Sequence, residues 1–153
     1  MDEQSASANT GLTSLAAKAT NLAMELDKLQ FTCGHESTAQ DISNITEELM
    51  LLEKVLNGLN QAISSKQEQY TRAFDEDLAE ICNHLGGIFD DISDCCTEMH
   101  KADGLNTKSV GWLRKKRYVS KLQKHLQANK TTLVVMRTVL HHGKEYGMQK
   151  SVF

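Results

Sequence analysis

The stretch Asp41–Ile63, DISNITEELMLLEKVLNGLNQAI, decides the fold class of this chain. Its apolar residues recur in alternating steps of three and four, the period of an α-helix with one buried face. These residues are Ile42, Ile45, Leu49, Leu52, Leu56, Leu59 and Ile63. Strict alternation of apolar and polar residues, which marks a β-strand, is absent from the chain. The stretch therefore predicts a long amphipathic helix.

Three further stretches show the same spacing. They contain Leu12, Leu15, Ala19, Leu22, Leu26 and Leu29; then Tyr70, Phe74, Leu78, Ile81, Leu85, Ile88, Ile92, Cys95 and Met99; and finally Val119, Leu122, Leu126, Asn129, Leu133, Met136 and Leu140. The chain has no Pro and few aromatic residues, which also favours helix throughout.

Short polar or Gly-containing segments separate the four patterns, and short connections favour antiparallel neighbours. We therefore predict an all-α fold, an antiparallel bundle of four long helices at about residues 10–30, 37–65, 69–102 and 117–144. Residues 109–116 allow a separate short helix before the last one. We assign residues 1–9 to a flexible N-terminus, 10–144 to a single domain, and 145–153 to a frayed tail or the start of a linker.

The charges are distributed unevenly. Residues 1–107 carry 6 basic and 19 acidic side chains, whereas residues 108–153 carry 11 basic and 1 acidic. The overall charge of −3 hides this asymmetry. It indicates either neutralisation inside the molecule or an anionic partner for the basic part.

The basic part centres on VGWLRKKRYVSKLQKHL (Val110–Leu126). Its candidate residues for binding an anion or lipid are Lys108, Trp112, Arg114, Lys115, Lys116, Arg117, Lys121 and Lys124. Four of them, Arg114, Arg117, Lys121 and Lys124, fall at steps of three, four and three, so they share one helix face. Trp suits the headgroup layer of a membrane, and each nearby cation adds about 1 kcal/mol of attraction to anionic lipid.

Two other interpretations of the basic segment remain open. The cations can instead face the third helix and neutralise its acidic residues, with each exposed pair contributing only about 0–1 kcal/mol. Those acidic residues are Asp75, Glu76, Asp77, Glu80, Asp90, Asp91, Asp94 and Glu98. A nucleic acid is the least favoured partner, because the whole chain is negatively charged.

The sequence contains no motif of an enzyme or a metal site. There is no Gly-rich phosphate loop, nucleophile elbow or Ser–His–Asp set. Cys96 and His100 are four residues apart, but CxxC and HExxH spacings are absent, and Cys82 and Cys95 are expected to be small buried hydrophobes. We therefore expect no enzymatic activity, no catalytic residue, no cofactor, no metal and no small-molecule substrate.

Gly86 and Gly87 interrupt the third helix. Each weakens a helix by about 1 kcal/mol relative to Ala, so the pair indicates a kink or a close helix contact, or a hinge for rearrangement. The chain shows neither a secretory signal nor an apolar run of transmembrane length. We expect a cytoplasmic protein that can associate peripherally with the plasma membrane.

The sequence resembles a known family. TGLTSLAAKATNLAMELDKLQ (Thr10–Gln30) followed by DISNITEELMLLEKVLNGLNQAI resembles the first two helices of the fungal HeLo-like N-terminal domain, and VGWLRKKRYVSKLQKHLQANKTTLVVM resembles its Trp-plus-basic segment and last helix. The similarity covers roughly residues 10–142. Such domains stand at the front of fungal STAND (NLR-type) receptors, ankyrin-repeat proteins and azaphilone-pigment-cluster proteins.

The resemblance implies an effector domain of nonself recognition, heterokaryon incompatibility and regulated cell death. It also implies oligomerisation and relocation to the plasma membrane, where residues 112–124 would dock on anionic lipid. There the first helix would insert and the membrane would be permeabilised. We thus expect a non-enzymatic signalling domain that self-associates or binds a partner protein. The alternative is a protein-interaction or oligomerisation module, an adaptor without membrane activity.

Overall fold

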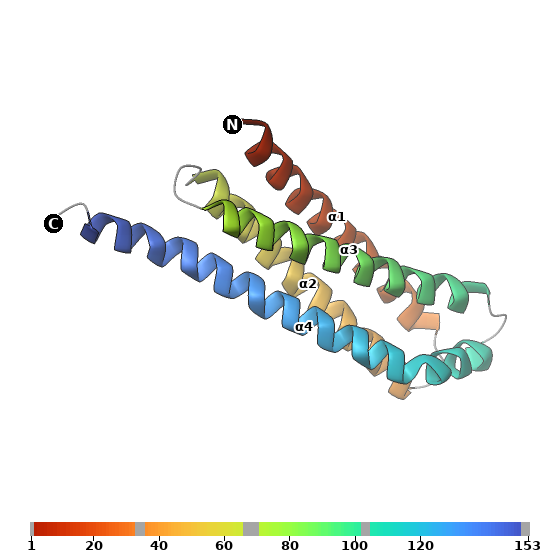
Figure 1. Cartoon of the computed structure of the whole chain (residues 1–153). Helices are drawn as coiled ribbons and strands as arrows, with labels where there is room; N and C mark the ends of the chain where they lie inside the picture. The colour runs from red at the N-terminus through yellow and green to blue at the C-terminus, as the bar shows by residue number, and fades with distance from the viewer. Residues whose placement is uncertain (1, 33–35, 66–70, 102–104, 151–153) are drawn as a thin grey trace.

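The computed structural model describes residues 2–32, 36–65, 71–101 and 105–150. They form four helices, α1 (Asp2–Thr32), α2 (Glu36–Ser65), α3 (Arg72–Lys101) and α4 (Leu105–Lys150), and these residues include no strand (Figure 1). The predicted all-α bundle of four long helices is confirmed. Residues 69, 70 and 102, which the sequence assigned to the third helix, lie outside the described part of the chain.

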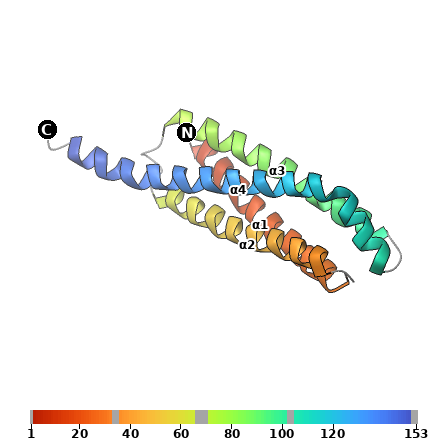
Figure 2. The ribbon, with the colours of Figure 1, turned by 90° about the horizontal axis from the view of Figure 1, so that it is seen from below.

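The bundle consists of two antiparallel hairpins, α1–α2 and α3–α4, lying side by side (Figures 1 and 2). Helix α1 packs most extensively against α2 and also contacts α3, while α4 contacts α2 and α3. Since the helices alternate in direction along the chain, α2 and α4 run parallel to each other, as do α1 and α3. This parallel α2–α4 pair determines which side chains meet along the surface discussed below.

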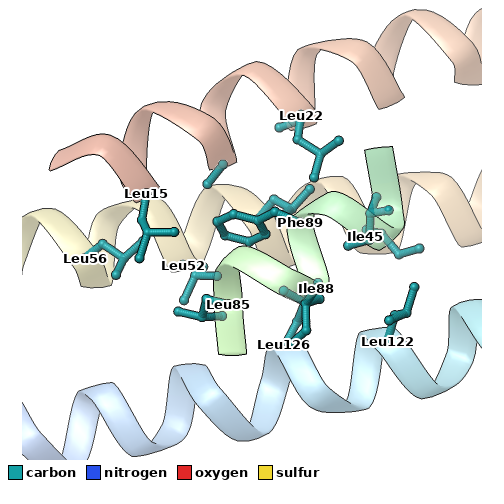
Figure 3. Packing of buried hydrophobic residues seen from close by; sticks show 14 of the residues in the cluster. Leu15, Leu22, Ile45, Leu52, Leu56, Leu85, Ile88, Phe89, Leu122 and Leu126 are labelled. Carbon is teal, nitrogen blue, oxygen red and sulfur yellow. The ribbon is translucent and has the colours of Figure 1, made fainter. Parts of the chain in front are cut away.

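One core joins all four helices. Every apolar position predicted on the Asp41–Ile63 stretch is buried, and in Figure 3 Phe89 of α3 lies between leucines of α1 and α2. Leu122 and Leu126 bring α4 into the same cluster. Fully burying one such side chain contributes about 1.5–3 kcal/mol, so the shared core dominates the stability of the bundle.

The helices extend beyond the ends that the apolar spacing predicted. Helix α1 begins at Asp2 instead of near residue 10, and α4 runs to Lys150 instead of ending near residue 144. Apolar spacing reports only the packed part of a helix, whereas a helix continues in its own direction until a breaker ends it, and neither segment contains Pro.

The separate short helix expected at residues 109–116 is not present. The backbone of α4 is helical without interruption from Leu105 to Lys150, although its first turns bend away from the axis of the remainder (Figure 2). Gly111 alone does not end a helix, and the residue that follows it packs into the core. The expected short helix is therefore the first part of α4.

Adjacent leucines in α2 allow the packing to be tested. Leu52 is fully buried, whereas Leu51 is 47% exposed. We predict that Leu52→Ala lowers the free energy of unfolding by about 2–5 kcal/mol, because it removes buried methyl groups and leaves a cavity. Leu51→Ala should change it by less than about 1 kcal/mol. Urea unfolding followed by circular dichroism measures both, and equal losses would contradict this helix rotation.

Candidate functional site

Trp112 lies inside the bundle. Its side chain is 2% exposed, and its indole Nε1 donates a hydrogen bond to Asp41 Oδ2 of α2 at 3.3 Å. Lys116 Nζ approaches the same carboxylate oxygen at 3.9 Å. A buried indole N–H needs an acceptor, and Asp41 supplies it. The structure therefore places Trp112 among core residues and not on the surface where a lipid headgroup would meet it.

The part of the basic segment that faces α3 is neutralised there. Lys115 Nζ forms an ion pair with Glu98, and this hydrogen bond raises the pKa of Lys115. The Tyr118 hydroxyl donates to the Asp91 carboxylate, which raises the pKa of that hydroxyl. Internal neutralisation thus accounts for some of the positive charge, since Glu98 of α3 pairs with Lys115, whereas Asp91 accepts from an uncharged hydroxyl.

Four cations of the segment have no carboxylate partner within ion-pair distance in the described residues. They are exposed, and we call them the basic stripe: Arg114, Arg117, Lys121 and Lys124. At 100° per residue they lie on the side of α4 opposite Leu122 and Leu126, which point into the core. They span ten residues, about 15 Å along the helix. The stripe is the strongest unneutralised charge feature that the sequence predicted.

Lys108, the remaining candidate, belongs to the first turn of α4, but its side chain lies outside the described part of the structure. A cation that was not a candidate also pairs with α2. Lys130 Nζ lies 2.8 Å from Glu48 Oε2, and both side chains are largely covered. The side of α4 that faces α2 therefore carries structural cations, distinct from the basic stripe.

The environment of the described cysteines favours a role in packing over one as reactive thiols. Cys95 and Cys96 are buried and Cys82 is half-buried. Burial raises the pKa of all three thiols, that of Cys96 to about 12, so the reactive thiolate is scarce at neutral pH. Among the described side chains no three His, Cys, Asp or Glu residues gather as metal ligands. The His100 side chain, predicted near Cys96, lies outside that set.

The two glycines of α3 lie in an unbroken helix. A Cβ atom added at Gly86 or Gly87 would find no neighbouring atom within 4 Å. The close helix contact considered for this pair is therefore wrong, because no helix approaches either backbone closely enough to require glycine. The hinge stays a prediction.

Within the described helices no segment is long and apolar enough to span a bilayer. No family model, curated protein or solved structure matches this chain. The support for a functional site therefore comes only from the side chains of this protein and their positions.

The free space at Gly86 and Gly87 leads to a prediction. Alanine should raise the free energy of unfolding at either position, by up to about 1 kcal/mol each, because it lowers the entropy of the unfolded chain without a clash. Thermal unfolding of Gly86→Ala, Gly87→Ala and the double variant tests it. A loss of stability would show that these positions need glycine in the folded protein.

Proposed function

We propose that this domain is a non-enzymatic signalling module that docks reversibly on an anionic membrane surface through the basic stripe. The single observation that carries the proposal is the exposure of Arg114, Arg117, Lys121 and Lys124 on one side of α4, without carboxylate partners in the described residues. The HeLo-like resemblance extends the proposal to regulated cell death or nonself recognition.

The strength of such docking follows from the number of cations. Each contributes about 1 kcal/mol near an anionic leaflet, so four supply about 4 kcal/mol. This corresponds to an equilibrium constant of about a thousand, since 1.4 kcal/mol is one factor of ten. Binding of this size is weak, reversible and reduced by salt.

The rest of the same helix face also supports a lipid surface. Beyond Lys124 the outward side of α4 carries Val135 and Val139, both more than half exposed. A membrane interface accepts cations at its headgroups and aliphatic groups just beneath them. A duplex nucleic acid would contact the cations but would gain little from the valines, and the net charge of −3 opposes its approach.

The proposal concerns the folded bundle. The apolar stripe of α1, which the resemblance would have insert into the membrane, is buried from Leu12 to Leu29. Docking through α4 leaves that stripe in place. Permeabilisation would require α1 to leave the core, so we propose it only as a later, triggered step after oligomerisation.

A second candidate function, a protein-interaction module, is favoured by a different surface. Met24 and Phe31 are seven residues apart on the outer face of α1 and are 57% and 83% exposed. Aromatic residues and Met are enriched at protein interfaces. These two residues would anchor a partner protein on the side of the bundle away from α4.

Flotation with anionic liposomes tests the docking proposal. At low salt the wild type should float with vesicles rich in phosphatidylserine and not with neutral vesicles. Changing Arg114, Arg117, Lys121 and Lys124 to Glu should abolish flotation, because it removes the attraction and adds repulsion.

The matched control changes Lys18, Lys28, Lys54 and Arg72 to Glu, which alters the net charge equally on exposed positions of α1, α2 and α3. This control should retain most of the binding. Equal loss in both variants would mean that net charge alone governs flotation, and absence of wild-type binding would remove the membrane proposal.

A further inference from the structure

An open groove runs between α2 and α4 on the side of α4 away from the basic stripe. Its volume is about 540 Å³, within the range of about 300–1,000 Å³ typical of small-molecule sites. The described residues that line it are Val55, Gly58, Gln61, Ala62, Ser65, Val134, Arg137, Thr138 and His141. They combine aliphatic groups, hydrogen-bonding groups and one permanent cation, without a carboxylate among them.

Arg137 lies directly against the backbone of α2. Its Nη1 atom is 2.8 Å, and its Cζ atom 3.1 Å, from the point that a Cβ atom on Gly58 would occupy. A side chain at position 58 would therefore displace the guanidinium. Glycine inside a helix lowers the stability of that helix by about 1 kcal/mol relative to Ala. At position 58 the absence of a side chain leaves the space that the Arg137 guanidinium occupies.

The parallel pairing of α2 and α4 shows what is missing beside Arg137. One heptad earlier on α4, Lys130 pairs with Glu48 of α2 at 2.8 Å. Seven residues on along both helices, Arg137 takes the place of Lys130, and Val55 takes the place of Glu48. In the described structure no carboxylate lies within ion-pair distance of Arg137. The repeat thus keeps the cation and replaces its counter-ion with an aliphatic side chain.

We propose that this groove binds a free aliphatic monocarboxylate of medium chain length. Its carboxylate would take beside the exposed Arg137 guanidinium the part that Glu48 takes beside Lys130, since a guanidinium matches two carboxylate oxygens. Its chain would lie on Val55 and Val134.

The geometry favours this occupant over others. A single guanidinium balances one negative charge, which fits a monocarboxylate better than a dianionic phosphate monoester. Val55 and Val134 each lie one helical turn before Gly58 and Arg137, so an aliphatic chain that leaves the guanidinium in this direction contacts both. The groove faces α2 and the basic stripe faces away from it, so the ligand comes from solution and not from a docked membrane.

Titration of the ¹⁵N-labelled protein with sodium octanoate, below its micelle-forming concentration, tests the proposal. The amides of Gly58, Val134 and Thr138 should shift together and saturate. Arg137→Gln should weaken binding at least ten-fold, whereas Arg72→Gln, which removes an exposed guanidinium on α3, should leave it unchanged. Gly58→Ala should weaken binding as well, because the new methyl group displaces the guanidinium.

The neutral analogue 1-octanol, with the same chain, should bind at least ten-fold more weakly than octanoate. Equal binding of octanol would show that the groove recognises only the chain, and shifts confined to the basic stripe would show non-specific charge attraction. Either result, or no saturable shift with octanoate, overturns the proposal. An Arg137→Gln variant that keeps native circular dichroism and full octanoate affinity would overturn it too.

Discussion

Burial of four apolar stripes in one shared core is the constraint on which the other features of this molecule depend. Once Leu122 and Leu126 point inward, the rotation of α4 about its own axis is fixed. Every other residue of that helix then has a determined direction, since successive residues are 100° apart. The outward direction of Arg117, Lys121 and the exposed valines is a consequence of core packing and needs no interaction of its own.

The same rotation separates the cations of α4 by role. Of those that face neighbouring helices, Lys115 meets Glu98 and Lys130 meets Glu48, whereas Arg137 lies against Gly58. Asp41 receives both the Trp112 indole and the approach of Lys116, so it ties the beginning of α4 to α2. The four cations of the basic stripe are exposed and have no carboxylate partner among the described residues, so their charge is available for an external surface at little cost in stability.

The fold could be predicted because apolar spacing reports how each helix is rotated, and this information is local. Trp112 carries the same local signal, since it precedes Val119 by seven residues and so extends the buried stripe of α4, although its basic neighbours indicate a surface position. The partners of the cations could not be predicted. Whether Lys115 meets Glu98, or Arg137 meets Gly58, depends on which helices are neighbours and on their axial offset, and sequence spacing carries neither.

Quenching of tryptophan fluorescence tests most directly whether α4 is rotated as described, because Trp112 is the only tryptophan of the chain. With its indole 2% exposed, acrylamide should quench the native protein far less than a free tryptophan amide, and unfolding in urea should remove this protection. Native protein quenched as readily as the free compound would place Trp112 outside. The core stripe, the basic stripe and the groove between α2 and α4 would then all be wrongly oriented.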